Sequence, residues 1–278
     1  MPVRLVGIDI DGTLLDSRGR LPPENEEALT AAAQRGVEVV LVTGRSFAFA
    51  VQATSDLLLP LTFIVSNGAA VKSHDGSTLL SWPLPRAVAR EVLATTPGFH
   101  ADLGIVFDVP GGSRTVYERI DWTHPHRAAY FARNRASIDE ASPLASALEA
   151  DPLAFVYNGS LARMRGLRAH LTTLPVCTQL EVAVTEYEAR DFALVDVLAR
   201  GCGKGPSLLA WARLRGIAAS EIMAIGDNLN DTEMLSRVGV PVVMGNAVAA
   251  LRDRGWHLTT THDEAGVARA IERFVLCG

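Results

Sequence analysis

The sequence predicts an α/β protein, with a doubly wound parallel sheet as its core and a smaller α+β domain inserted into it. Two observations predict this fold. Short, almost continuously apolar segments alternate with helical segments at both ends of the chain, as in parallel sheets whose strands are buried on both faces. Between them, residues 84–190 follow a different order of helices and strands.

The N-terminal part of the chain begins the sheet. Residues 3–10 are nearly all apolar and predict a buried strand, and residues 24–35 predict a helix that a glycine stops. A second strand is predicted at 37–42, a helix at 47–58 and a third strand at 62–65. Because short connections join strand, helix and strand, we expect right-handed parallel crossovers.

The C-terminal part returns to the same alternation. Predicted helices cover residues 206–215, 231–237 and 264–275, and predicted strands cover 221–225, 241–244 and 256–259. The sheet is therefore expected to form from residues 1–83 and 191–278 together. In the insertion, helices are expected at 86–95 and 161–172 and strands at 104–109 and 152–157.

Composition narrows the class of protein. The chain has 278 residues, of which 48% are hydrophobic, so it has enough apolar side chains for a sizeable core. The net charge of −5 comes from interspersed charges, which argues against a nucleic-acid surface and favours a small-molecule partner. An odd number of cysteines, three, without metal-ligand spacing is typical of a reducing compartment.

Targeting signals are missing from the sequence pattern. The N-terminus lacks the charged and apolar regions of a signal peptide, and no apolar run approaches the roughly 20 residues of a membrane span. A cytoplasmic protein without a membrane partner is expected. The sequence pattern does not indicate the oligomeric state.

Polar clusters follow three of the predicted strands. They are Asp9-Ile10-Asp11-Gly12-Thr13, Val42-Thr43-Gly44-Arg45 and Gly226-Asp227-Asn228-Leu229-Asn230-Asp231. In open parallel sheets, ligands bind beyond the carboxyl ends of the strands. The fold therefore predicts that these three clusters form one site.

Asp9 and Asp11 suit phosphoryl transfer. On an extended backbone, side chains two residues apart point the same way, so two carboxylates share one site. Their repulsion favours a bound cation or a raised pKa. Mg²⁺ takes oxygen ligands, which Asp9 and Asp227 can supply. We expect Asp9 to attack phosphorus and Asp11 to act as general acid and then general base.

Phosphate oxygens need fixed donors, because positioning and electrostatics contribute most to phosphoryl transfer. The Thr43 hydroxyl and the Gly44 amide lie at the mouth of a predicted strand. Lys204 lies between two glycines, just before a predicted helix. It offers a positive charge near the N-terminus of that helix. These three groups are the predicted phosphate donors.

These motifs resemble those of the haloacid dehalogenase superfamily of phosphatases, closest to the Cof-like branch with a large type IIB cap after the second motif. Four motifs match in order: Asp9-x-Asp11-Gly12-Thr13, Thr43-Gly44-Arg45, Lys204 and Gly226-Asp227-x-x-Asn230-Asp231. Residues 66–69, 245–247 and 264–267 also resemble this branch. The resemblance implies a Rossmann-like core and an inserted cap that selects the substrate.

The resemblance also implies roles for single residues. Asp9 would be nucleophile and metal ligand, Asp11 would ligate the metal through its backbone carbonyl, and Asp227 would complete the protein ligands. Asp231 and Asn228 would support this shell. Asn230 would bind phosphate together with Thr43, Gly44 and Lys204.

Four further features have simpler interpretations. Arg45 is expected to form a surface or structural salt bridge, and Cys202 to be a small buried residue. Asn67 either lines the substrate pocket or caps the turn after its strand. The cluster at residues 122–127, which contains His124 and His126, is expected to be a surface turn with a helix beginning at His126.

The predicted function is Mg²⁺-dependent hydrolysis of the phosphate monoester of a small metabolite, such as a sugar phosphate, through an aspartyl-phosphate. Two alternatives stay open. A phosphotransferase or phosphomutase would use the same core and pass the phosphoryl group to a second hydroxyl. A regulator would bind a phosphorylated metabolite without turnover, although binding alone does not need the carboxylate of Asp11.

Overall fold

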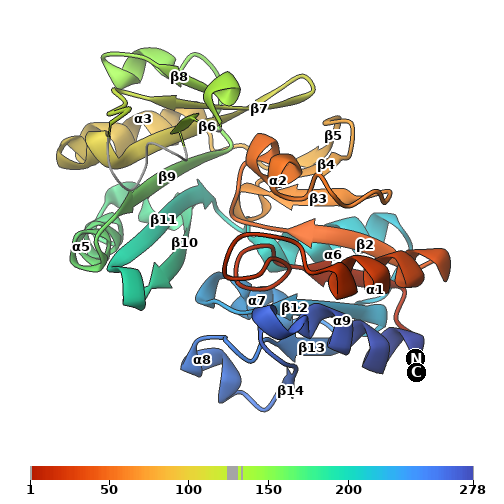
Figure 1. Cartoon of the computed structure of the whole chain (residues 1–278). Coiled ribbons are helices and arrows are strands. Elements are labelled where there is room, and N and C mark those ends of the chain that lie inside the picture. The colour runs from red at the N-terminus through yellow and green to blue at the C-terminus, as the bar shows by residue number, and fades with distance from the viewer. Residues whose placement is uncertain (1, 124–130, 133, 278) are drawn as a thin grey trace.

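The protein folds into two lobes, each with its own β-sheet (Figure 1). The computed structural model describes residues 2–123, 131, 132 and 134–277. Both chain termini lie on the same lobe, and the middle of the chain forms the other (Figure 1). This arrangement confirms the predicted α/β class and its mostly parallel main sheet.

The larger lobe, here called the core lobe, contains eight strands among the described residues, in the order β14-β13-β12-β1-β2-β3-β4-β5. Neighbours from β14 to β3 run parallel, and β4 and β5 add an antiparallel hairpin. The strands are β1 (Leu5–Ile8), β2 (Glu38–Val42), β3 (Thr62–Val65), β4 (Ala70–Ser73), β5 (Thr78–Ser81), β12 (Ile222–Gly226), β13 (Val240–Val243) and β14 (His257–Leu258).

Helices cover both faces of this sheet, with α1 and α9 on one face and α6 on the other (Figure 1). The helices of the core lobe are α1 (Pro23–Gln34), α2 (Phe47–Ala53), α6 (Lys204–Leu214), α7 (Thr232–Ser236), α8 (Ala249–Arg252) and α9 (Gly266–Ile271), followed by a π-helical turn (Glu272–Leu276). Covering both faces removes every residue of β1 from solvent, which explains its unbroken apolar sequence.

Helix α2 is shorter than predicted, because it ends at Ala53 rather than at residue 58. Thr54 leaves the helical region, with φ −122° and ψ 21°, and its hydroxyl donates to the carbonyl of Ala50 at 2.9 Å. This side-chain bond competes with continued helix, as threonine often does.

The second lobe, here called the cap, contains six strands among the described residues, in the order β10-β11-β9-β6-β7-β8. All neighbours are antiparallel except β7 and β8. The elements are α3 (Arg86–Thr95), β6 (Leu103–Val109), β7 (Gly112–Tyr117), β8 (Ile138–Glu140), β9 (Ala154–Gly159), α5 (Leu161–Leu171), β10 (Leu180–Tyr187) and β11 (Phe192–Ala199).

The predicted domain boundary after residue 190 differs from the structure at β11. The predicted boundary places this strand in the core, but it pairs with β10 and β9 in the cap sheet. A tight turn at Asp191, with φ 43°, joins β10 to β11 and makes them a hairpin. The cap sheet therefore extends to Ala199, and the chain returns to the core lobe just before Lys204.

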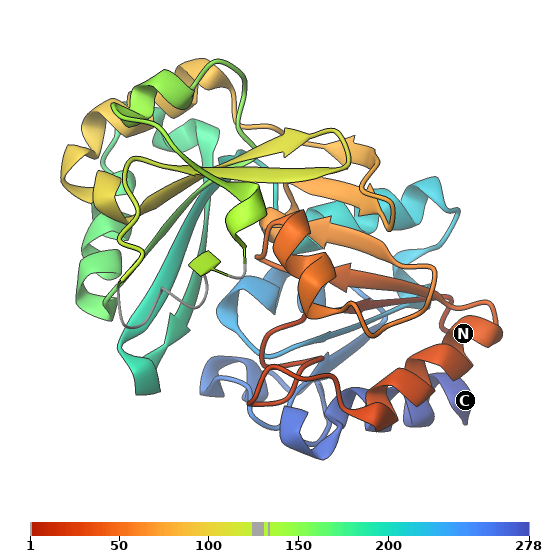
Figure 2. The ribbon, with the colours of Figure 1, turned by 45° about the horizontal axis from the view of Figure 1, so that its top comes forward.

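Each lobe has its own hydrophobic core, and the two lobes are distinct bodies in both views (Figures 1 and 2). A small apolar cluster joins α2 to the cap, formed by Phe49, Tyr117, Ile120, Phe131 and Ile138. In the part of the chain that the structure describes, no helix has the length and apolar character that crossing a membrane requires. Cys202 is buried, as predicted.

Candidate functional site

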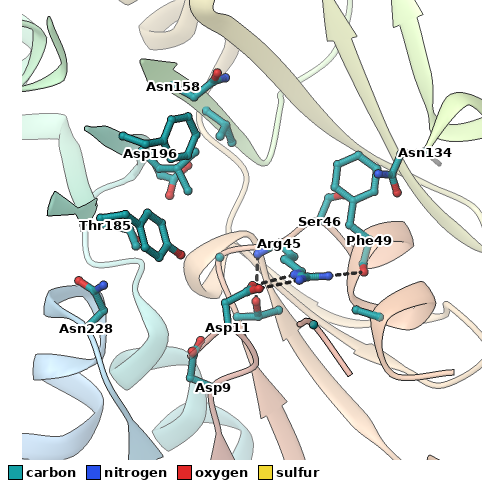
Figure 3. Close-up of a pocket in the computed structure, with 18 of the residues that line it drawn as sticks. Asp9, Asp11, Arg45, Ser46, Phe49, Asn134, Asn158, Thr185, Asp196 and Asn228 are labelled. Atoms are coloured by element: carbon teal, nitrogen blue, oxygen red, sulfur yellow. Dashed lines mark hydrogen bonds and ion pairs between the residues drawn. The ribbon is translucent and has the colours of Figure 1, made fainter. Parts of the chain in front are cut away.

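Strands β12, β1 and β2 are neighbours in the sheet, so their carboxyl ends bring the three polar clusters together. Asp9 follows β1, Thr43 follows β2 and Asp227 follows β12. A cavity of about 1180 Å³ opens over this edge, and residues of both lobes line it. Figure 3 shows Asp9 and Asp11 facing Thr185 and Asp196 of the cap across this space.

Lys204 links two buried carboxylates, those of Asp9, which lines the cavity, and Asp231; together with Asp227 these carboxylates are here called the acidic floor. Its Nζ lies 2.6 Å from Oδ1 of Asp9 and 2.6 Å from Oδ1 of Asp231. Burial by itself would lower the pKa of Lys204, but the charges of Asp231 and Asp9 outweigh it and raise the pKa above its ordinary value. Lys204 is therefore a fixed positive charge at the end of β1.

Asp9 carries an unusual pKa for a carboxyl group. Burial raises it to about 7, although the ammonium of Lys204 lowers it, and the charges of Asp231 and Asp11 raise it further. The side chain is 5% exposed. Water stabilises a buried carboxylate less than an exposed one. The adjacent positive charge of Lys204 offsets this loss and favours the reactive ionised form of Asp9.

Asp227 and Asp231 complete the acidic floor. The Thr13 hydroxyl donates to Oδ1 of Asp227 at 3.3 Å. Oδ2 of Asp231 accepts the backbone amides of Asp227 and Asn228, at 3.0 and 3.2 Å. Burial, followed by the charges of Asp9 and Asp231, raises the pKa of Asp227 well above its usual range. The loop after β12 is thus built around the side chain of Asp231.

The acidic floor fits a divalent cation. One carboxylate oxygen from each of Asp9, Asp227 and Asp231 lies within 4.8 Å of the other two. Asp231 already uses one oxygen for Lys204 and the other for backbone amides, so Asp9 and Asp227 are the carboxylates with oxygens to offer. Three buried carboxylates around one ammonium leave excess negative charge, which a cation would offset.

Asp11 points away from Asp9 toward Arg45 (Figure 3). Arg45 donates from Nε to Oδ2 at 2.7 Å and from an η nitrogen to Oδ1 at 2.6 Å, a bidentate pair. Arg45 forms the expected salt bridge, and its partner is a residue of the site. Its side chain is 30% exposed and lines the cavity, so it holds one of the predicted catalytic carboxylates.

The predicted phosphate-binding residues surround the same floor. Thr43 and Gly44 line the cavity, and the Thr43 hydroxyl accepts the amide of Arg45 at 3.1 Å. Asn230 also lines it and donates from Nδ2 to Oδ1 of Asn67 at 3.0 Å. Asn228 faces the cap and donates to the carbonyl of Glu186 at 3.3 Å. The structure brings all the predicted residues into one region.

The side chain of Asn67 bonds to side chains of both lobes. It is buried in the left-handed region, with φ 50° and ψ 35°, and its amide nitrogen donates to Oδ2 of Asp196 in the cap. The prediction that Asn67 lines the substrate pocket stays a prediction, and its partner Asp196, which lines the cavity, was missed. Its place on alternate positions with Phe192 and Leu194 along an apolar strand was the available signal.

Tyr187 was also missed. It lines the cavity at the end of β10, and its ring stacks on Phe192 with centroids 6.2 Å apart. Burial, and then the negative charges of Asp11, Asp9 and Asp227, raise the pKa of its hydroxyl. The predicted surface turn at residues 122–127 lies largely outside the described residues, including His124, His126 and the helix expected there.

Fold and site together define a class of hydrolase, and comparison with known proteins names it. A family model described as haloacid dehalogenase-like hydrolase matches residues 6–271, so the chain belongs to this family. The family match and the phosphatases among its relatives confirm two predictions from the motifs: the chain belongs to the Cof-like branch, and it is a phosphatase.

Several relatives support this placement. The chain is 30% identical to an HMP-PP phosphatase of Serratia proteamaculans, over 90% of this chain and 86% of the relative. It is 27% identical to the pyridoxal phosphate phosphatase YbhA of Escherichia coli, over 91% and 92%. A solved haloacid dehalogenase-like hydrolase from B. subtilis shares the fold, with a TM-score of 0.82, 23% identity and coverage of 98% and 100%.

Proposed function

We propose that this phosphatase hydrolyses the phosphate monoester of a small metabolite with Mg²⁺, through an aspartyl-phosphate on Asp9. The observation that carries the proposal is the buried group of Asp9, Lys204, Asp227 and Asp231, in which Asp9 and Asp227 line a cavity shared by both lobes. It combines a nucleophile, a fixed positive charge and a fitting cation site within a few ångströms.

In the first half-reaction, an oxygen of Asp9 attacks phosphorus and the bond between phosphorus and the ester oxygen breaks. Asp11 gives its proton to the departing oxygen, so the leaving group departs as an alcohol. Lys204, the Thr43 hydroxyl and the Gly44 and Asn230 amides hold the phosphate oxygens. Bound Mg²⁺, held by Asp9, Asp227 and the Asp11 carbonyl, would neutralise phosphate charge.

In the second half-reaction, water attacks phosphorus and gives its proton to Asp11, which releases inorganic phosphate and restores Asp9. In the described conformation Arg45 occupies both oxygens of Asp11. Proton transfer therefore requires that Asp11 release at least one of these bonds when the ester binds.

We propose that the inserted lobe acts as the substrate-selecting cap. Its sheet presents neutral polar side chains to the cavity, including Thr115, Asn158 and Thr185. Hydroxyl and amide groups suit a small polar ester such as a sugar phosphate. The relatives' names, which include HMP-PP and pyridoxal phosphate, also favour a phosphorylated small metabolite over a macromolecule.

A phosphate-release screen over sugar phosphates, nucleotides and cofactor phosphates, with Mg²⁺ and without an acceptor, tests the proposal. We expect release from at least one ester class, and none from the Asp9→Asn variant. Transfer of the phosphoryl group to an added sugar, without release of phosphate, would identify a phosphotransferase instead of a hydrolase. Tight binding of an ester without either product would favour a regulator.

A further inference from the structure

Asp196 stands out in the cavity wall because it is a buried carboxylate with few partners. It is 3% exposed, and among the described residues its Oδ1 has no hydrogen-bond partner. It is also the one carboxylate that a described strand of the cap sheet presents to the cavity. Burial raises its pKa to about 7, which the bond from Asn67 and the charge of Lys204 only partly offset. Such a group costs stability, so its presence points to a functional role.

Among the described residues, the one side-chain hydrogen-bond partner of Asp196 belongs to the other lobe. Asn67 donates from Nδ2 to Oδ2 of Asp196, across 129 residues of sequence. The other end of the same amide, Oδ1, accepts from Nδ2 of Asn230 at 3.0 Å. One amide therefore connects a cap strand to a proposed phosphate ligand, and each of its two ends has a defined partner.

The backbone of Asn67 is held at the centre of the phosphate-binding loops. Its amide donates to the carbonyl of Thr43 at 3.0 Å. The next residue, Gly68, packs so tightly that a Cβ there would lie 2.3 Å from the carbonyl oxygen of Gly203, and its own carbonyl accepts the Ser207 hydroxyl at 2.7 Å. With the backbone fixed on both sides, only the side-chain torsions of Asn67 stay adjustable, and its amide bonds to Asp196 at one end and to Asn230 at the other.

We propose that Asp196 is a positioning residue, through which docking of the cap orients Asn67 and, in turn, Asn230 toward the phosphate. The inference rests on the proposed function, since it takes Thr43, Lys204 and Asn230 to hold phosphate. When the cap is seated, Asp196 directs the amide nitrogen of Asn67 to itself. The carbonyl oxygen of Asn67 then faces Asn230 and leaves the second N–H of that side chain for a ligand.

Binding of inorganic phosphate to the full chain with Mg²⁺, measured by calorimetry, tests this chain of contacts without any leaving group. Asp196→Ala should weaken phosphate binding about three- to tenfold, the usual effect of losing one hydrogen bond. Asp196→Asn should restore it, because its amide oxygen accepts the same bond from Asn67. Adding Asp196→Ala to Asn67→Ala should weaken binding no further.

The control is Asp108→Ala. Asp108 is another cap carboxylate paired with a buried core side chain, since its Oδ1 lies 2.5 Å from Nζ of Lys72, but it does not line the cavity. This variant should bind phosphate as the wild type does. Thermal unfolding of each variant shows whether it is folded.

Steady-state kinetics adds a second measurement. If Asp196 positions the phosphate ligands, Asp196→Ala should lower kcat/KM by a similar factor for esters with unrelated leaving groups. A changed preference among leaving groups with unchanged phosphate affinity would overturn the inference, as would an equal loss in Asp108→Ala or no phosphate binding by the wild type. A wild-type protein that binds phosphate but hydrolyses no ester would refute the proposed function alone.

Discussion

At the scale of single residues, the site depends on how buried charges are balanced. Asp9, Asp227 and Asp231 are buried around one ammonium, that of Lys204, so each carboxylate that changes alters the state of the others. Arg45 and Asp11 form a second pair at the more exposed margin of the cavity. In the reaction we propose, the buried carboxylate of Asp9 forms the covalent bond, and the more exposed carboxylate of Asp11 transfers the proton.

Replacement of the nucleophile should remove activity and spare the fold. In Asp9→Asn we expect a loss of about 10⁴-fold or more in kcat, since an amide cannot form the aspartyl-phosphate. Lys204 keeps Asp231 as its partner, so the variant should stay folded. Phosphate release and thermal unfolding measure the two effects. Asp253→Asn, an exposed position outside the cavity, is the control, and near-wild-type turnover in Asp9→Asn would contradict the mechanism.

Replacement of Asp11 should have a smaller effect. Asp11→Asn keeps the size of the side chain but removes proton transfer, for which a loss of about 10²- to 10⁴-fold is usual. The loss should be greatest for esters with poorly leaving alcohols and smaller for an activated aryl phosphate, which needs less protonation. Equal losses for both kinds of ester would argue against a general acid at this position.

Asp196 should make the stability of the protein depend on pH. Its pKa is about 7 in the folded protein and near 3.8 when exposed, so the folded state binds more protons between these values. The stability that protonation provides is complete below about pH 4 and is lost as the pH rises through 7. Asp196→Asn lacks this titration, so its free energy of unfolding, measured by urea denaturation without Mg²⁺, should rise relative to wild type from pH 4 to 8. A constant difference would contradict the raised pKa.

At the scale of elements, the loops after the parallel strands are shaped by glycines at close contacts. Gly12 has φ +78°, and a Cβ on it would lie 2.3 Å from Oδ2 of Asp227. Gly12 therefore lets the chain turn after Asp11 and also leaves room for a carboxylate from β12. A glycine that the sequence marks only as a turn is here part of the proposed cation site.

The two consequences of Gly12 can be separated by mutation. Gly12→Ala should displace Asp227 and abolish most Mg²⁺-dependent activity. Gly36→Ala is the matched control, because Gly36 has φ +80° with nothing within 4 Å of the added carbon. Both should lose about 1–2 kcal/mol of stability to the left-handed backbone, but only Gly12→Ala should lose activity. Activity and urea denaturation measure these effects, and full activity in Gly12→Ala would exclude the contact with Asp227.

At the scale of the whole molecule, the cavity exists only because two separately built lobes face each other. The core lobe supplies the acidic floor, and the cap supplies Asn158, Thr185, Tyr187 and Asp196. Lys72 and Asp108 form a further contact between the lobes, with Lys72 fully buried. We therefore expect the position of the cap to influence substrate choice, and to influence phosphate binding through Asp196.

Cation binding should stabilise the folded molecule as a whole. A ligand that binds only the native state adds RT ln(1 + [L]/Kd), about 2.7 kcal/mol at a hundredfold excess over Kd. For a chain of this size we expect Mg²⁺ to raise Tm by several degrees, and EDTA to reverse this and stop turnover. Calorimetry of Asp227→Asn should show little Mg²⁺-dependent change in Tm. An equal Mg²⁺-dependent rise in the Tm of that variant would show that the cation binds elsewhere.

Much of the fold was predictable because local patterns determine it. The helix over Arg86–Thr95 and the strand at Leu103–Val109 follow from apolar periodicity and from nearby residues that end helices and strands. The boundary of the cap was not, because a strand such as β11 does not show in its own sequence which sheet it will join. Its partners β9 and β10 decide that, and apolar strands of either lobe have similar composition.

By itself, the sequence determined the parallel core, the polar clusters at its strand ends and the grouping of Asp9, Asp11, Thr43 and Asp227. Adjacent strands of one parallel sheet end at one edge, so local order was enough. Tertiary structure alone decided that Arg45 binds Asp11 and that Asp196 reaches Asn67. The first pair depends on rotamers within the core lobe, and the second depends on the docking of two lobes, with Asn67 and Asp196 being 129 residues apart. No local pattern records such contacts, because burial and partner choice arise only when segments distant in sequence pack together.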